Sequence, residues 1–172
     1  MKIAVISDIH DNLVNLDKAL RIIKREKVET IICCGDVTTV ETLERLRQGF
    51  SGEIFLVTGN MEIYDESEAR QIEGINFLGK FGVVQLADHN FGACHEPFYI
   101  ERLLASRPDV DFDIIFYGHT HKPWLEEKVV RGRSVRLANP GTLGGVFQKA
   151  SFAVYDLDSR ELGLKVLENI EG

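Results

Sequence analysis

Short apolar runs alternate with longer periodic segments along this chain, and the alternation predicts its order of elements. Runs rich in β-branched residues at 3–6 and 30–34 have the composition of strands buried on both faces. Between them, apolar residues recur every three or four positions across 12–27, which predicts an amphipathic helix capped by Asp11 or Asn12. A strand, a helix and a strand in this order predict a right-handed βαβ unit with parallel strands.

The second half of the chain changes to the pattern of antiparallel hairpins. Asp88-His89-Asn90 is a turn sequence between two strand patterns, so His89 is expected to be exposed. No linker or repeat interrupts the chain, which predicts one domain over residues 1–172, an α/β (α+β) fold of two packed sheets with helices outside. The remaining predicted elements are helices at 41–48 and 98–106, strands at 53–58, 80–86, 91–94, 113–117, 151–157 and 161–167, and a hairpin that turns near Gly132.

Composition and charge exclude several classes of function. A net charge of −7 argues against sequence-independent binding to nucleic acids, which needs clustered Lys and Arg. No window approaches the roughly 20 apolar residues of a membrane span, and the chain starts directly with a strand, so neither a membrane segment nor a signal peptide is expected. The three cysteines form no C-x-x-C pair, which favours free thiols and a cytoplasmic location.

Side chains that can bind metal ions follow the predicted strands. One such residue is more often a structural cap, but seven of them, including a His-x-His pair, favour a metal site. Asp8 and His10 are one residue apart, a spacing that places both side chains on the same side of a strand. The carboxyl ends of parallel strands meet at one edge of a sheet, where ligands collect. The candidates are Asp8, His10, Asp36, Asn60, His95, His119 and His121.

The chemistry of these seven side chains limits the choice of metal. Imidazoles, carboxylates and one amide without a cysteine suit Mn²⁺, Fe or Zn²⁺ and disfavour a thiolate-held structural zinc. Seven ligands are too many for one tetrahedral ion. They fit two ions about 3.5–4 Å apart with a shared carboxylate, as in two-metal hydrolases.

The order of the motifs resembles the calcineurin-like metallophosphoesterase superfamily. The motifs are Asp8-Ile-His10, Gly35-Asp36, Gly59-Asn60, His95 and Gly118-His-Thr-His121. The short chain and the turn Asn139-Pro-Gly-Thr142 are most similar to the compact prokaryotic phosphodiesterase branch, the YfcE/Vps29-like proteins. The resemblance covers nearly the whole chain and implies a four-layer αββα sandwich of two mixed β-sheets flanked by helices.

The resemblance also implies a role for each candidate residue. Asp8, His10 and His121 would hold one divalent ion. Asn60, His95 and His119 would hold the other, and Asp36 would bridge the two. Mn²⁺ is the expected metal, with Fe, Zn and Ni as alternatives. The implied mechanism is attack on phosphorus by a metal-bound hydroxide, with Asn60 and His95 as the catalytic residues.

Two positions depart from the family pattern. Many superfamily members have a histidine directly after the Gly-Asn pair, where it can protonate the leaving group, and this chain has Met61. Glu62 is either a substitute acid or a solvated loop residue. The compact branch often has His-Gly where this chain has His95-Glu96-Pro97, so the substrate contact beside His95 is open.

Three functions stay open. The leading one is hydrolysis of a small phosphodiester or nucleotide substrate. A phosphomonoesterase would need extra cations, for which Lys122, Arg131 and Arg133 are candidates. A Vps29-like binding scaffold would need a contiguous patch from exposed apolar residues such as Phe98, Tyr99 and Trp124. A homo-oligomer is compatible with each of these functions, and no membrane partner is expected.

Overall fold

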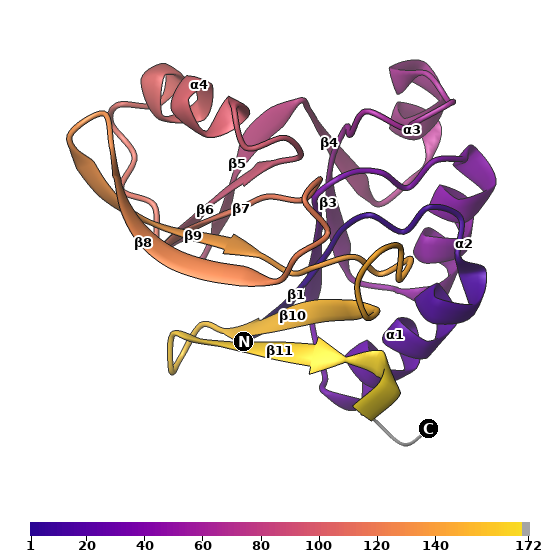
Figure 1. Cartoon of the computed structure of the whole chain (residues 1–172). Coiled ribbons are helices and arrows are strands. Elements are labelled where there is room, and N and C mark those ends of the chain that lie inside the picture. The colour runs from indigo at the N-terminus through magenta and orange to yellow at the C-terminus, as the bar shows by residue number, and fades with distance from the viewer. Residues whose placement is uncertain (170–172) are drawn as a thin grey trace.

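The apolar run at the start of the chain forms the central strand of a six-stranded sheet in the computed structural model, which describes residues 1–169 (Figure 1). The strand order in this sheet A is β11-β10-β1-β2-β3-β4. Strands β1 to β4 run parallel, and β10 is antiparallel to both β1 and β11. Its strands are β1 (Lys2–Ile6), β2 (Thr30–Cys33), β3 (Glu53–Val57), β4 (Ile75–Gly79), β10 (Ser151–Asp156) and β11 (Glu161–Val166).

The second sheet contains the strands from the middle of the chain. In this sheet B the order is β5-β6-β7-β9-β8, with parallel pairing of β6 to β7 and of β7 to β9 and antiparallel pairing elsewhere. Both sheets are therefore mixed. The strands are β5 (Phe81–Leu86), β6 (His89–Cys94), β7 (Ile114–Phe116), β8 (Trp124–Val130) and β9 (Arg133–Asn139).

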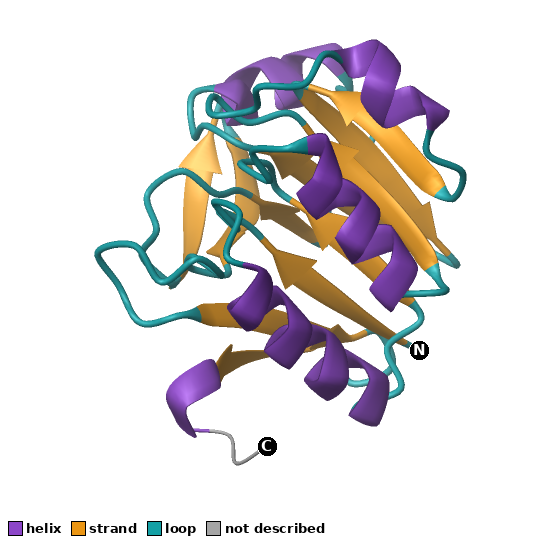
Figure 2. Ribbon diagram, turned by 90° about the vertical axis from the view of Figure 1, so that its right-hand side faces the viewer, coloured by secondary structure: helices purple, strands orange, loops and turns teal. Residues whose placement is uncertain are grey.

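Helices cover the outer faces of both sheets and give the four layers that the sequence predicted (Figures 1 and 2). The helices α1, α2 and α3 lie against sheet A, and α4 lies against sheet B. They are α1 (Leu13–Arg25), α2 (Val40–Gly49), α3 (Glu66–Gln71) and α4 (Tyr99–Ser106), and a short 3-10 helix, Leu167–Asn169, ends the described chain.

Alternation along β1 divides its side chains between two cores. Ile3 and Val5 point into the core between the two sheets, while Ala4 and Ile6 point into the core beneath the helices of sheet A. All four side chains are fully buried, because a sheet packed on both faces has no solvated side.

The periodic helix pattern after β1 is confirmed with one exception. Asn12 caps α1 by accepting a hydrogen bond from the Asn15 amide, and Leu16, Leu20 and Ile23 are buried. Leu13 is the exception, with 45% of its surface exposed.

Two elements between residues 60 and 80 were not predicted. Helix α3 begins with a capping box in which Asp65 accepts from the amide of Glu68, whose carboxylate accepts from the amide of Asp65. Strand β4 pairs in parallel with β3 across a register shift at Leu56 and Val57. Its apolar stretch is short, and its pairing with β3 decides its conformation more than its own pattern does.

The prediction that His89 is an exposed turn residue is wrong. The turn is formed by Ala87 and Asp88, and His89 is already the first residue of β6, with 5% of its surface exposed. Its ring stacks on Phe91 and lies 3.1 Å from the carboxylate of Asp113.

A helix needs about 20 apolar residues to cross a bilayer. Among residues 1–169, no helix is long and apolar enough to do so.

Candidate metal centre

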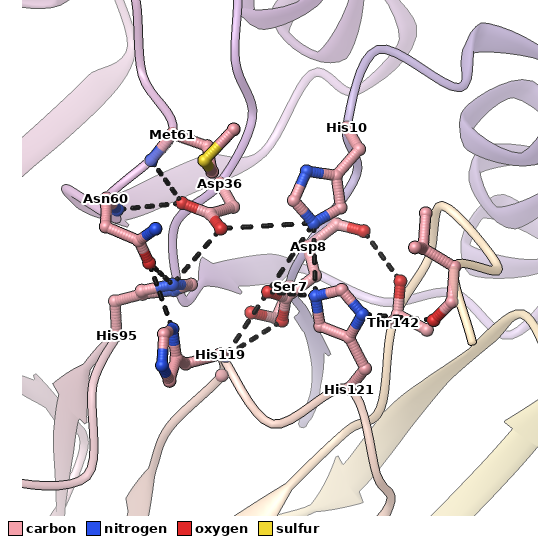
Figure 3. Close-up of polar contacts among 12 residues, drawn as sticks. Ser7, Asp8, His10, Asp36, Asn60, Met61, His95, His119, His121 and Thr142 are labelled. Carbon is pink, nitrogen blue, oxygen red and sulfur yellow. Dashed lines mark hydrogen bonds and ion pairs between the residues drawn. The ribbon is translucent and has the colours of Figure 1, made fainter. Parts of the chain in front are cut away.

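The seven predicted side chains come together at the edge where the carboxyl ends of strands from both sheets meet (Figure 3). They are supplied by the loops after β1, β2 and β3 of sheet A and after β6 and β7 of sheet B. The prediction of one shared edge therefore describes the observed arrangement, although the two sheets contribute to it jointly.

Five of the seven residues have a left-handed backbone: Asp8 (φ 54°), His10 (φ 48°), Asp36 (φ 54°), His119 (φ 67°) and His121 (φ 59°). This conformation is uncommon for residues other than glycine, and clusters of it occur at functional sites. Strand β1 ends at Ile6, so the period-two argument for Asp8 and His10 does not explain their shared direction. The loop turns them inward, and its amides at positions 8 and 10 donate to the carbonyls of Gly35 and Asp36.

One group of ligand atoms is formed by Asp8, His10 and His121. The Nε2 atoms of the two histidines are 3.2 Å apart, and Nε2 of His121 lies 3.3 Å from Oδ1 of Asp8. The ligand atoms of all three residues lie within 4.8 Å of one another. The arrangement has the size of a metal coordination sphere.

A second group surrounds Asp36. Nε2 of His95 lies 3.3 Å from Oδ2 of Asp36 and 3.0 Å from Oδ1 of Asn60, which in turn lies 3.0 Å from Nδ1 of His119. Oδ2 of Asp36 is also 3.9 Å from Nε2 of His10 in the first group. Asp36 therefore lies between the two groups.

Backbone carbonyls orient two of the histidine rings. Nδ1 of His95 lies 2.7 Å from the Cys34 carbonyl, and Nδ1 of His121 lies 3.0 Å from the Val146 carbonyl. A carbonyl only accepts, so each Nδ1 donates a proton and each Nε2 turns a lone pair toward the centre in the neutral ring. At His95 this lone pair faces a carboxylate oxygen and an amide oxygen, both acceptors. Three acceptors that converge in this way need a cation or a proton between them, so the residues fit a metal ion.

Burial and neighbouring charges shift the pKa values of the central groups in different directions. Burial raises the pKa of Asp8. Burial also opposes ionisation of Asp36, but the hydrogen bond that His95 donates when its Nε2 is protonated, together with those from the amides of Asn60 and Met61, lowers the pKa of Asp36 to about 2. Burial disfavours the charged ring of His95, and the Asp36 carboxylate outweighs that effect and raises its pKa. Two buried carboxylates beside imidazoles supply the negative charge that a divalent cation neutralises.

The glycines in the motifs are explained by close approach of the chain. A Cβ atom on Gly59 would lie 2.0 Å from Oδ1 of Asp36. On Gly118 it would lie 2.0 Å from Oγ of Ser7 and 2.9 Å from Oδ2 of Asp8. Any larger residue at either position would displace a candidate ligand.

Glu62 is neither a solvated loop residue nor an acid that faces the centre. Its Oε1 accepts from the amide of Asp36 at 2.8 Å and from that of Val37 at 3.4 Å. In return, Oδ1 of Asp36 accepts from the amides of Asn60 and Met61 at 2.8 and 2.9 Å. The two loops therefore hold each other through carboxylates, and burial raises the pKa of Glu62.

The turn at 139–142 contributes contacts that the sequence did not reveal. Asn139 donates to the carbonyl of Gly118 at 2.8 Å and to the hydroxyl of Thr120 at 3.1 Å. The Thr142 hydroxyl donates to the carbonyl of Asp8 at 2.9 Å (Figure 3). The turn was visible in the sequence as part of the resemblance, and its side chains tie together the loops after β1 and β7.

The candidate cations lie at different places. Lys122 is exposed next to His121, with Nζ 5.0 Å from the ring centroid of Trp124. Arg131 is in the turn between β8 and β9, and Arg133 bonds to the carbonyls at 107 and 110. Neither arginine is among the contacts of the centre.

The three residues named for a scaffold surface are not equally exposed. Phe98 and Trp124 are 55% and 48% exposed, but Tyr99 is partly buried and packs against Phe81 and Phe98.

The family model of the calcineurin-like phosphoesterase superfamily domain matches residues 1–160. The phosphodiesterase MJ0936 of Methanocaldococcus jannaschii is 28% identical over 172 residues, which cover 98% of this chain and all of that protein.

Solved structures agree with this assignment. A structure described as a novel archaeal phosphodiesterase superimposes with a TM-score of 0.79 at 28% identity and covers 96% of this chain and 99% of that one. YfcE of E. coli, described as a phosphoesterase, has a TM-score of 0.70 at 20% identity and covers 97% of this chain and all of that one, which shows the shared fold. Chaetomium thermophilum Vps29 has a TM-score of 0.66 at 20% identity, with 96% of this chain and 95% of that one covered. The chain therefore belongs to the calcineurin-like phosphoesterase superfamily and is a phosphoester hydrolase.

Proposed function

We propose that this protein is a two-metal phosphodiesterase with an active site at the shared edge of its sheets. The observation that carries the proposal is the convergence at Nε2 of His95, where lone pairs of a ring nitrogen, a carboxylate and an amide oxygen meet within 3.3 Å. A second convergence, at Nε2 of His121, lies on the other side of Asp36.

Each residue has a role in this proposal. Asp8, His10 and His121 would hold one ion, Asn60, His95 and His119 would hold the other, and Asp36 would contribute to both. The position of Asp36 supports the bridging role, because its Oδ2 lies 3.3 Å from Nε2 of His95 and 3.9 Å from Nε2 of His10. Imidazole and carboxylate ligands suit Mn²⁺, with Fe, Zn²⁺ or Ni²⁺ as alternatives.

The protein orients the candidate ligands, and three of them, Asp8, Asp36 and His95, are buried. Divalent ions held by these residues would supply Lewis acidity, which lowers the pKa of water toward 7 and stabilises negative charge on the phosphoryl oxygens. Asn60 is exposed at the mouth of the site and can donate its amide N–H to a phosphoryl oxygen. The carbonyls behind His95 and His121 keep both rings aimed at the centre.

No side chain in the described contacts offers a proton to the leaving group. Met61 occupies the position after Asn60, and Glu62 accepts hydrogen bonds from the amides behind Asp36. This arrangement favours esters whose leaving oxygen departs as an anion, such as aryl esters.

Charge favours a diester over a monoester. A phosphodiester carries one negative charge, and a terminal phosphate carries up to two. Lys122 is the one predicted cation that lies beside a candidate ligand, and its ammonium lies over the Trp124 ring. Arg131 and Arg133 belong to the hairpin of β8 and β9, and would not neutralise the second negative charge of a monoester. The three buried thiols suit a reducing cytoplasm, where we place the enzyme.

The test compares bis-p-nitrophenyl phosphate with p-nitrophenyl phosphate as substrates of chelator-treated protein, with and without added Mn²⁺. We expect metal-dependent turnover of the diester that exceeds turnover of the monoester. Asp36→Asn keeps the size of the side chain and removes its charge, and should lower diester turnover by at least about 100-fold.

Turnover that survives chelation, or that Asp36→Asn leaves intact, would contradict the two-metal mechanism. Turnover of neither ester with Mn²⁺, Zn²⁺, Fe or Ni²⁺ would contradict the enzymatic function and favour a binding role.

A further inference from the structure

One large apolar side chain beside the centre is almost completely exposed. Phe147 is 91% exposed, more than any other large hydrophobic residue of the described chain. Its backbone is also left-handed, with φ of 62°, which is a steric outlier for an aromatic residue. Exposure forgoes the stabilisation that burial of an aromatic side chain gives, and strain of this kind persists where a structure imposes it, often at ligand sites.

The loop that contains Phe147 is fixed to the candidate ligands. The amide of Gly144 donates to the carbonyl of Asp8 at 2.8 Å. The carbonyl of Val146, directly before Phe147, faces Nδ1 of His121 at 3.0 Å. Two contacts to metal-site residues therefore determine where the Phe147 ring can lie.

The ring lies beside the first ligand group. The centroids of the Phe147 and His121 rings are 6.1 Å apart with an interplanar angle of 27°, a stacked arrangement. The other edge of the His121 ring, at Nε2, is 3.3 Å from Oδ1 of Asp8. Phe147 is therefore one stacked ring away from the ligand group at which a phosphate would bind, and most of its remaining surface is exposed.

We propose that Phe147 determines substrate specificity by stacking on a planar group of the phosphoester, so that the substrates are nucleotide or aryl esters. The inference rests on the proposed function, because it needs a phosphate at the metal centre. An aryl or nucleobase group lies only a few bonds from its phosphate. Stacking on an aromatic ring tolerates any base, since every base has a π face.

Adenosine 5′-monophosphate and ribose 5-phosphate form a matched pair of probes, since the nucleotide has a planar base where the sugar phosphate has its C1 hydroxyl group. Calorimetric titration of Mn²⁺-loaded protein with each probe measures binding, and chromatography of the samples afterwards checks that neither probe was hydrolysed during the titration. We expect the wild-type protein to bind the nucleotide about tenfold more tightly than the sugar phosphate, as one stacked base predicts.

Variants assign this preference to Phe147. Phe147→Ala should abolish the preference, and Phe147→Trp should keep it. Phe98→Ala is the control, because Phe98 is also exposed but lies at the start of α4. It should leave the preference unchanged.

A preference that persists in Phe147→Ala would overturn the inference. The same samples are assayed with bis-p-nitrophenyl phosphate. Lack of turnover together with a preference that depends on Phe147 would refute the proposed function alone.

Discussion

Strand β6 has a histidine at each end, and the two residues have opposite surroundings. His89 begins the strand and His95 follows its last residue, and both are buried, with 5% and 0% of their surface exposed. His89 pairs with the Asp113 carboxylate at 3.1 Å and packs between Phe91 and Tyr155. His95 faces two acceptors with its free ring nitrogen while a carbonyl occupies the other.

The comparison shows that burial does not identify a metal ligand. His89 can donate from Nδ1 to the Asp113 carboxylate, so this contact needs no ion. His95 has more acceptors around it than its ring has protons, and a cation completes the arrangement. The excess of acceptors is therefore the feature that separates a ligand from a structural histidine.

Turnover should differ most strongly between variants of His95 and His89. His95→Asn removes a candidate ligand and should lower metal-dependent diester turnover by at least about 100-fold. His89→Asn should change turnover less than about twofold, because it lies at the opposite end of β6. Steady-state kinetics with saturating Mn²⁺ measures both. Comparable losses in the two variants would show that the distinction drawn between them is wrong.

The free energy of unfolding should report the structural role of His89. His89→Asn loses a buried hydrogen bond to a carboxylate and the stacking on Phe91, so the free energy of unfolding should fall by about 1–3 kcal/mol. Urea unfolding of the metal-free proteins measures the change. An unfolding midpoint equal to that of the wild type would mean that the pair with Asp113 contributes nothing.

Acid should reduce the contribution of Asp36, the partner of His95, to the free energy of unfolding. The pKa of Asp36 is about 2 in the folded protein, below the unfolded value of about 3.9. The stabilisation from the ionised Asp36 carboxylate is present above about pH 4 and is lost as the pH falls toward 2. The free energy of unfolding should therefore fall by about 1 kcal/mol between pH 5 and pH 3. Urea unfolding in EDTA should show this loss in the wild type relative to Asp36→Asn. A constant difference between the two proteins would refute it.

Much of the site could be predicted because motif residues lie next to strong strand patterns. The seven candidates follow β1, β2, β3, β6 and β7, and parallel strands deliver their ends to a common edge. The same local reasoning failed at His89. The polar residues Asp88 and Asn90 predicted a turn at His89, but the left-handed turn residue is Ala87, and β6 already begins at His89.

Contacts between distant segments could not be predicted from local patterns. Glu62 bonds to amides 25 and 26 residues away, and Phe147 stacks on a ring from another loop. Strand β4 likewise depends on β3 for its register. In each case the decisive partner is known only after the sheets have assembled.

The position of β1 in sheet A has a consequence for synthesis on the ribosome. This strand is made first, yet one of its two neighbours is β10, which is made near the end. Until β10 emerges, one edge of β1 presents unpaired N–H and C=O groups on an apolar strand, which is the kind of edge that recruits other chains. A nascent chain therefore contains all seven candidate ligands before β10, which pairs with the strand that precedes Asp8, has been translated.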